Sequence, residues 1–246
     1  MTLGIIGKGF VGSTLMRDWP ADYVYDSKNI ESIAGCEFDM LVCAGAPAEK
    51  WKANNYPEDD LASLNRLLSA LADGVQARTF VLISTIDVMS HTLGGKYGEH
   101  RLMFENQVKH LFPHAQIVRL PALFGAGLKK NALYDLLMEN ALAPHVVASS
   151  YQWYPISRLR NDIGNMLMVG LGELDLFPPS IPMITIMKAF FPNAARRVYV
   201  PNRFAPEPAN YNFPPSPEFY RTEFYLSREC VLGHMAEFIA QERTTA

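Results

Sequence analysis

The first twelve residues constrain what this chain can fold into more than any other stretch. Residues 3–6 (LGII) are an apolar run typical of a buried strand, and they lead directly into G-x-G-x-x-G at Gly7, Gly9 and Gly12. Apolar residues at helical spacing follow from Ser13. In such a strand–turn–helix unit the glycines let a pyrophosphate approach the backbone, and the helix N-terminus holds its phosphates. The stretch predicts a dinucleotide site, with a glycine turn that binds nothing as the alternative interpretation.

An acidic side chain lies where a dinucleotide site requires one. Asp26 follows an apolar segment at 23–25, at about the twenty-residue offset from which a carboxylate reaches an adenosine ribose. A carboxylate there repels the 2′-phosphate of NADP, so we expect NAD as the cofactor; Lys28 weakens that preference, and NADP stays an alternative. The cofactor residues predicted from this stretch are Gly7, Lys8, Gly9, Phe10, Val11, Gly12, Asp26 and Ser27.

Strands and helices alternate through the first half of the chain. Apolar runs at 39–43, 79–84 and 116–120 are typical of buried strands, and the apolar spacing at 59–71 and 97–111 is helical. This alternation predicts an α/β fold, a doubly wound (Rossmann) parallel sheet covered on both faces. Ligands of such sheets bind beyond the carboxyl ends of the strands. The small or polar residues there are predicted to contact the cofactor: Cys43, Ala44, Gly45, Ala46 and Ser84.

Three residues near the end of the 79–84 strand suggest catalysis. Thr85 follows that strand, and Tyr97 and Arg101 lie four apart, on one face of the helix that follows. A tyrosine can take a proton from a substrate hydroxyl while a nicotinamide takes the hydride, provided its pKa of about 10 is lowered by a neighbouring cation. The alternative interpretation is an interfacial tyrosine and a solvated arginine on an amphipathic helix.

The motifs GKGFVG (7–12), CAGAP (43–47), ISTIDV (83–88) and YGEHR (97–101) together resemble the short-chain dehydrogenase/reductases. They are most similar to the extended branch that contains the NAD-dependent sugar epimerases and dehydratases, and RLPALFGAG (119–127) matches that branch's loop beside the nicotinamide. The resemblance covers about residues 1–170. It implies that Thr85 is the catalytic Ser/Thr and Tyr97 the base, that Asp26 binds the ribose, and that the nicotinamide is contacted by Pro121, Ala122 and Leu123.

Three departures from the family pattern bear on activity. The family has Tyr-x-x-x-Lys, whereas this chain has Arg101, which can keep the electrostatic role of the lysine and lose its geometry. The family's helix asparagine is replaced by Asp59 or Asp60. Thr85 and Tyr97 are only twelve residues apart, closer than is usual in the extended branch.

The second half of the chain offers candidate substrate residues. Lys129 and Asn131 can face an anionic substrate or begin a solvated helix over 132–140, and the aromatic stretch 151–155 can line a pocket or form an edge strand. Ser157 is expected to cap a helix through about Val169. The prolines of 201–217, with Phe204 among them, predict an irregular excursion or lid, and Cys230, Val231, Met235, Phe238 and Ile239 predict a terminal amphipathic helix. The substrate candidates are Lys129, Asn131, Gln152, Tyr154 and Arg158.

Composition excludes several classes of partner. The formal charge is −3, which gives no sign of nucleic-acid affinity, and no apolar run is as long as a membrane span. Three cysteines without metal spacing, together with unclustered histidines, predict reduced core or near-core thiols, no metal site and a cytoplasmic location. The chain begins directly with a strand, so we expect no signal peptide.

The sequence therefore predicts a dinucleotide-binding domain at 1–150 and a small C-terminal substrate portion at 151–246, interwoven with the first. The expected function is NAD(P)-dependent oxidoreductase or epimerase chemistry on a hydroxyl or keto group of a small molecule, with a sugar or nucleotide-sugar as candidate. The alternative is a dinucleotide-binding sensor or partner-binding protein that has lost turnover. We also expect a homodimer through the helices near 59–72 and 97–111.

Overall fold

The chain forms two compact units. The computed structural model describes residues 1–196, 207–217 and 224–245. Unit 1 comprises Met1–Leu120 and Arg158–Asp175, and unit 2 comprises Pro121–Ser157 and Leu176–Ala246. The division thus falls at Leu120 rather than near residue 150, because the last helix and strand of unit 1 follow the first segment of unit 2 in the chain.

Unit 1 is built on a six-stranded parallel sheet with the order β2-β1-β3-β4-β5-β9. The chain passes from β2 to β3 through a 3₁₀ turn, η1 (Ile30–Ile33), and β3 pairs on the other side of β1, so the strand order reverses between β1 and β3. That reversal is where doubly wound sheets bind ligands, at the carboxyl ends of the strands. The strands are β1 (Leu3–Ile6), β2 (Tyr23–Tyr25), β3 (Glu37–Cys43), β4 (Gln76–Thr85), β5 (Gln116–Leu120) and β9 (Glu173–Asp175).

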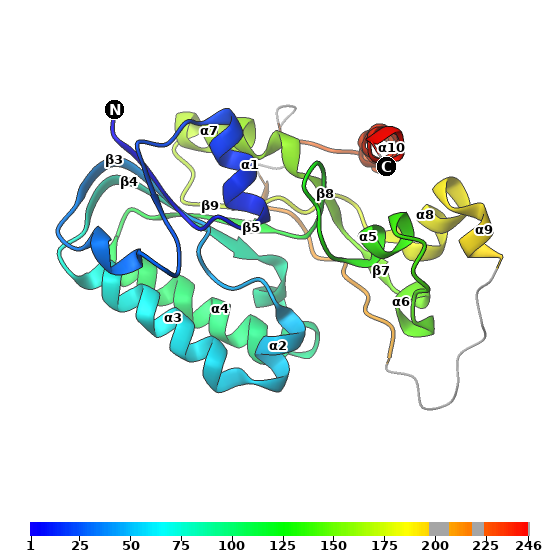
Figure 1. Ribbon diagram of the computed structural model, residues 1–246, viewed down its shortest axis with the longest axis horizontal. Coiled ribbons are helices and arrows are strands. Elements are labelled where there is room, and N and C mark those ends of the chain that lie inside the picture. The colour runs from blue at the N-terminus through cyan, green and yellow to red at the C-terminus, as the bar shows by residue number, and fades with distance from the viewer. Residues whose placement is uncertain (197–206, 218–223, 246) are drawn as a thin grey trace. The chain divides into compact units, whose positions relative to one another are not determined.

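Helices cover both faces of this sheet, which confirms the predicted doubly wound α/β fold. Figure 1 shows α1 (Phe10–Asp18) and α7 (Leu159–Val169) on one face, and α3 (Pro57–Ala72) and α4 (His91–Leu111) on the other. The short helix α2 (Lys50–Asn55) precedes α3. The apolar stripe of α3 is buried as its spacing predicted, through Leu64, Leu67 and Leu71, and Pro57 and three acidic residues in the first turn favour its start.

Helix α4 packs unusually closely on the 3₁₀ turn η2 (Ile86–Met89), which follows β4. A Cβ atom built on Gly94 or on Gly98 lies 2.2 or 2.3 Å from the carbonyl oxygen of Asp87. Only glycine fits at either position, because a side chain would have to displace backbone. The helix can therefore start almost directly after the strand, which explains how twelve residues are enough to connect Thr85 to Tyr97.

A buried charge network joins α4 to the far strands of the sheet. The guanidinium of Arg119 (β5) donates to both carboxylate oxygens of Glu105 (α4), at 2.9 and 2.7 Å, and to Asp175 (β9) at 3.1 Å. Glu105 is 1% exposed and Arg119 8% exposed. Each buried charge is thus paired, as burial of a charge requires.

Unit 2 consists of short elements. Strand β6 (Ala122–Phe124) pairs in parallel with β8 (Trp153–Pro155), and β7 (Ser150–Tyr151) pairs in antiparallel with β10 (Ile181–Pro182). Its helices are α5 (Ala132–Leu137), α6 (Pro144–Ala148), α8 (Met183–Phe190), α9 (Pro192–Ala195) and α10 (Arg228–Thr245). Trp153, Tyr154, Phe124 and Phe177, each at most 1% exposed, belong to its interior.

Two local predictions were wrong, and one lies partly outside the described residues. Ser157 does not cap α7; it belongs to the 3₁₀ turn η3 (Ile156–Arg158), and Arg158, with helical dihedral angles, occupies the cap position. Cys230 is exposed, whereas the other apolar residues named for α10 are buried, because Cys230 lies off the buried stripe. In the proline-rich stretch, 201–206, including Phe204, is outside the described residues; 207–216 forms no regular helix or strand.

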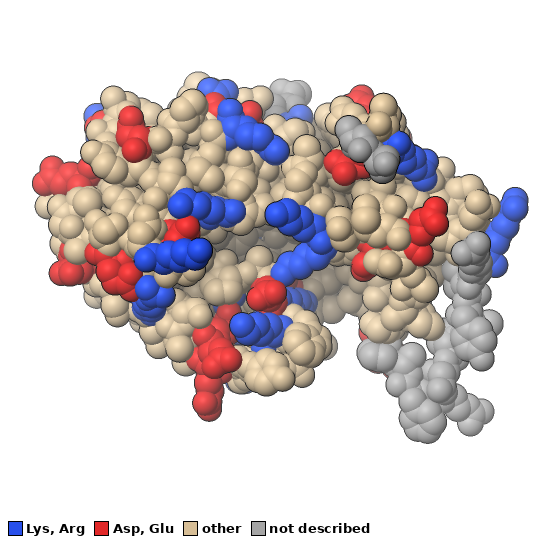
Figure 2. Space-filling model, in the orientation of Figure 1, with Lys and Arg blue, Asp and Glu red and all other residues tan. Residues whose placement is uncertain are grey.

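None of the helices in the described ranges is long and apolar enough to cross a bilayer. No group of three metal-ligating side chains occurs within those same ranges. Acidic and basic side chains are both spread over the face in Figure 2.

The contact between α4 and η2 makes a prediction about stability. Gly98→Ala should lower the free energy of unfolding by about 1 to 3 kcal/mol, because its Cβ meets the Asp87 carbonyl and the backbone must move. The matched control is Gly164→Ala in α7, whose Cβ meets nothing within 4 Å and which should gain up to about 1 kcal/mol from helix propensity. Urea denaturation measures both, and equal effects for the two variants would contradict the packing argument.

Candidate active site

The glycine-rich turn has the geometry of a pyrophosphate cradle. Gly7 has a φ of +104°, and its N–H donates to the carbonyl of Tyr25 at 2.8 Å, so the turn is tied to the end of β2. A Cβ on Gly12 would lie 1.9 Å from the Gly7 carbonyl oxygen, so α1 starts against the turn. A Cβ on Gly9 would meet nothing within 4 Å, and no side chain caps the N-terminus of α1. Open space over Gly9 and an uncapped helix end fit the phosphates of a dinucleotide.

Asp26 is charged at the end of β2. The backbone N–H of Lys28, 2.8 Å from Oδ1, and the Lys8 ammonium, 3.0 Å from Oδ2, hold the pKa of Asp26 below its usual range. The cation that bonds this carboxylate directly is thus Lys8, inside the glycine turn, and not the side chain of Lys28. Ser27 is exposed in the same turn.

The ends of β3 and β4 carry the other residues that the sequence assigned to the cofactor. Ala44, Gly45 and Ala46 follow β3, and the Ala44 N–H donates to Ile6 at 2.8 Å. The thiol of Cys43 is fully buried, which raises its pKa to about 11, and its side chain therefore belongs to the core. The hydroxyl of Ser84 donates to the buried Glu105 at 2.5 Å.

Thr85 and Tyr97 come together at the end of β4. Tyr97 is 8% exposed. Burial raises the pKa of Tyr97, and the Asp87 carboxylate adds to this; the Arg101 guanidinium and a hydrogen bond with the Thr85 side chain act in the opposite direction. Arg101 therefore lowers the pKa of Tyr97, as expected, but burial has the larger effect. The phenol is protonated at neutral pH.

Arg101 is held inside unit 1. Its guanidinium donates to both oxygens of Asp60 in α3, at 2.9 and 2.7 Å, and to the carbonyl of Pro47. Its Cζ atom stacks 4.4 Å from the centroid of the Tyr97 ring, and only 3% of the residue is exposed. Burial opposes the ionisation of Asp60, yet Arg101 and His100, whose Nδ1 lies 2.9 Å away, keep its pKa below the usual value. The solvated-arginine alternative is therefore wrong, and the guanidinium is engaged with protein groups.

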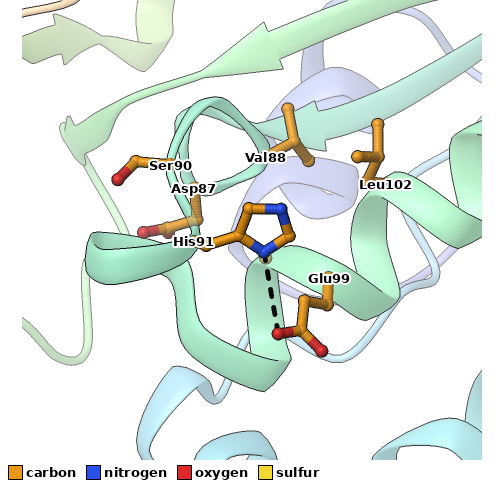
Figure 3. A pocket seen from close by; sticks show the side chains of 7 residues that line it. Asp87, Val88, Ser90, His91, Glu99 and Leu102 are labelled. Atoms are coloured by element: carbon orange, nitrogen blue, oxygen red, sulfur yellow. Dashed lines mark ion pairs between the residues drawn. The ribbon is translucent and has the colours of Figure 1, made fainter.

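A small hollow opens between η2 and α4 (Figure 3). The His91 ring points toward Glu99, with 3.7 Å between its Nδ1 and the Glu99 Oε1. The residues that line the hollow do not include Thr85, Tyr97 or Arg101, so it is not where the catalytic candidates converge. They are Asp87, Val88, Ser90, His91, Gly98, Glu99 and Leu102.

The remaining predicted residues are divided between the units. Pro121, Ala122 and Leu123 begin unit 2, where the Ala122 N–H donates to Gln152 at 3.0 Å. Lys129 is exposed, and Tyr154 is fully buried. Arg158 lies in unit 1 and pairs with Asp162 at 3.3 Å.

Two of the substrate candidates, Asn131 and Gln152, form hydrogen bonds with backbone groups of unit 2. The Asn131 side chain caps α5, accepting from Leu133 and Tyr134 at 3.0 Å each and donating to Leu123 at 2.9 Å. The Gln152 amide donates to the carbonyls of Pro178 and Phe213 and accepts from the Phe213 N–H, all within 2.9 Å.

Sequence reasoning named Asp60 only as one of two replacements for the family's helix asparagine, and it gave no role to Asp87, Lys50 or Asn54, which also lie around Tyr97. Asp60 holds Arg101, and Asp87 bonds Thr85, with 3.1 Å between Oδ2 and Oγ1. Lys50 and Asn54 of α2 also reach α4, to Leu93 and Tyr97. Their spacing of four, which puts both on one face of a helix, was the available signal, but α2 is too short to be recognised from periodicity.

Comparison with known proteins shows the fold. No protein-family model and no curated protein matches the chain. Among the similar solved structures is MoeE5 in complex with UDP-glucose and NAD, with 13% sequence identity, a TM-score of 0.74, and coverage of 100% of this chain and 99% of that chain. The dTDP-glucose 4,6-dehydratase DesIV of Streptomyces venezuelae, with NAD bound, has 15% identity and a TM-score of 0.74, and the match covers 99% of this chain and 97% of that chain. The dTDP-4-dehydrorhamnose reductase of Bacillus anthracis, with NADP, has 18% identity and a TM-score of 0.72, and the match covers 98% of this chain and 99% of that chain. The chain therefore has the fold of the extended short-chain dehydrogenase/reductases, as the motifs predicted.

The Arg101–Asp60 pair makes the second prediction. Arg101→Met should cost about 3 to 5 kcal/mol of unfolding free energy, because it leaves the Asp60 charge buried beside His100 alone. Arg101→Met/Asp60→Asn should recover part of that loss by removing the buried charge. The control is Arg66→Met, which breaks an exposed pair with Glu31 and should cost far less unfolding free energy than Arg101→Met. Equal losses of unfolding free energy in Arg101→Met and Arg66→Met would show that the buried pair stabilises the fold no more than the exposed pair.

Proposed function

We propose that this protein is an NAD-dependent enzyme of the dehydrogenase or epimerase type that acts on a hydroxyl or keto group of a sugar or nucleotide-sugar. The observation that carries this proposal is the convergence of Thr85 and Tyr97 at the end of β4, in the same sheet whose β1 leads into the glycine cradle. The structural matches crystallised with NAD and UDP-glucose, or with NAD or NADP, support the same chemistry.

The cofactor's place is assigned to the glycine turn and the strand ends beside it. Gly7, Gly9 and Gly12 would hold the pyrophosphate, and Asp26 would accept hydrogen bonds from the adenosine ribose. Bound NAD would supply the hydride acceptor. Because Lys8 bonds Asp26 directly, the charge that disfavours NADP is partly neutralised, so the preference for NAD is modest.

The protein's own acid–base group is Tyr97. Its Oη holds a proton in the free protein, since burial raises its pKa, and can therefore donate to a keto oxygen or, once deprotonated, accept from a hydroxyl. Thr85 hydrogen-bonds the phenol and can bind the same substrate oxygen. Arg101 supports the phenolate through its charge while it stays bonded to Asp60 and Pro47.

Substrate binding is assigned to unit 2. A pocket there is lined by aromatic and proline side chains, among them Phe177, Phe213 and Tyr225, with Asn212 as a polar group. Gln152 contributes to its wall and ties its two proline-bearing segments together through Pro178 and Phe213. Aromatic walls with few polar groups are typical of small-molecule sites.

A dinucleotide-binding sensor is the second candidate function. It is favoured by the engagement of Arg101 with Asp60 and Pro47, which takes the cation in the family's lysine position out of reach of a ribose. A cytoplasmic location is part of both proposals and is supported by three free thiols.

A homodimer through α3 and α4 is the proposed assembly. In α4, Val108 is fully buried and Met103 packs against the core of its own unit, whereas Leu102 is 37% exposed and lies at the surface that a partner would contact. Sedimentation velocity at micromolar concentration should show a species of twice 27.6 kDa. A single species at the monomer mass would reject the dimer.

The experiment that tests the function begins with binding. Titration calorimetry should show NAD bound modestly more tightly than NADP. Tyr97→Phe should leave the affinity for NAD within a few-fold, because the hydroxyl is not assigned to the cradle. Absence of binding for both cofactors would reject the enzyme and the sensor together.

The same experiment continues with turnover on nucleotide-sugars, beginning with UDP-glucose and dTDP-glucose and followed by absorbance of the reduced cofactor and by product analysis. Tyr97→Phe should reduce turnover by about a hundredfold or more, the usual contribution of acid–base catalysis. The control is Tyr56→Phe, which changes an exposed tyrosine. Turnover indifferent to Tyr97→Phe would overturn the assignment; NAD binding without any turnover would favour the sensor.

A further inference from the structure

Helix α4 contains a break directly before the candidate base. Gly95 has a φ of +59° and a ψ of −149°, outside the helical region, so α4 is two helices joined at this residue. In an unbroken helix the N–H of Tyr97 and the carbonyl of Leu93, four residues earlier, would be partners. At a break such groups need other partners, because helix ends leave backbone donors and acceptors unsatisfied.

Helix α2 provides a side chain for each of these two groups. The Lys50 ammonium donates to the Leu93 carbonyl, and the Asn54 Oδ1 accepts from the Tyr97 N–H at 2.9 Å. Lys50 and Asn54 are one helical turn apart and reach α4 on opposite sides of Gly95. We call these two side chains the α2 clamp.

The clamp fits the break closely. A Cβ on Gly95 would lie 2.8 Å from Asn54 Oδ1 and 3.2 Å from its Cγ, so the amide lies against the bare backbone of the glycine. Lys50 also pairs with Asp87 Oδ1 at 2.6 Å, and the other oxygen of Asp87 bonds Thr85. The clamp therefore contacts both the helix that carries Tyr97 and the turn that follows Thr85.

We propose that Lys50 and Asn54 are positioning residues for Tyr97. Asn54 fixes the start of the helix segment from which the Tyr97 ring projects, and Lys50 holds the preceding turn and offsets the Asp87 charge near the phenol. The catalytic meaning of this role rests on the proposed function, whereas the positioning itself does not. Neither residue belongs to the motifs that carry the family resemblance.

The two side chains should affect the Tyr97 phenol in opposite directions. Loss of the Asn54 acceptor frees the Tyr97 N–H and admits water to the ring, which relieves the burial that raises its pKa. Loss of the Lys50 charge leaves the negative charge of the Asp87 carboxylate uncompensated on that side, and this raises the pKa of Tyr97 further. A general loosening of the fold would instead change the pKa of Tyr97 in the same direction in both variants.

The test is a pH titration of the protein labelled with ¹³Cζ-tyrosine, followed by NMR. Tyr97→Phe identifies the Tyr97 signal among the eleven tyrosines. Asn54→Ala should lower the Tyr97 midpoint by about half a pH unit or more, and Lys50→Met should raise it. Asn54→Asp keeps the acceptor oxygen and adds a negative charge, so it should not lower the Tyr97 midpoint.

The matched control is Asn55→Ala, because the Asn55 amide donates within α2, to the Trp51 carbonyl at 2.7 Å. An unchanged Tyr97 midpoint in Asn54→Ala, an equal change in Asn55→Ala, or a lower midpoint in Lys50→Met would each overturn the clamp. Failure of the clamp and failure of the proposed function are distinguishable. If the midpoints change as expected while Tyr97→Phe retains turnover, the clamp stands and the proposed function fails.

Discussion

The arrangement of the candidate site depends on one contact, in which the carbonyl oxygen of Asp87 lies against the bare backbone of Gly94 and Gly98. The strand β4 ends at Thr85, so a helix that follows after only a few residues must pass close to the turn it has just left. Gly94 and Gly98 are four residues apart on one face of the helix, and because neither has a side chain the carbonyl can lie against their backbone. Tyr97 lies between them in sequence and is thereby brought to Thr85, with the short turn η2 as the main connection.

Charges of opposite sign fix α4 from both sides. Arg101 bonds Asp60 of α3, and one turn further Glu105 bonds Arg119 of β5. Burying such pairs adds little net stability compared with apolar packing, but each pair excludes arrangements in which a charge would be left alone. The helix that carries the candidate base is thus specified by electrostatics as well as by volume. As a consequence, the guanidinium of Arg101 is bonded inside unit 1 and does not point into solvent.

The sequence predicted those features that are encoded by neighbours along the chain. The glycine turn, the buried strands and the helices over 59–71 and 97–111 follow from local periodicity, and the structure confirms them. The engagement of Arg101 could not be predicted, because its partners, Asp60 and Pro47, are 41 and 54 residues away. The same holds for Gln152, whose amide bonds backbone groups 26 and 61 residues away. Asn131, in contrast, caps α5, at the start of the helix that the sequence offered as its alternative role. The Ser157 cap was wrong because a 3₁₀ turn, rather than extended chain, precedes α7.

The interleaving of the two units has a consequence for how the chain is synthesised and cut. The edge strand β9 and the helix α7 belong to unit 1 but leave the ribosome after residues 121–157 of unit 2. Until they arrive, β5 is an open edge whose Ile117 and Val118, both fully buried in the finished protein, have no covering strand or helix on that side. Unpaired apolar edges invite pairing with other chains. A fragment that ends near residue 150 therefore lacks α7 and β9 and leaves the edge of β5 open, and the chain must extend through Asp175 before that edge is closed.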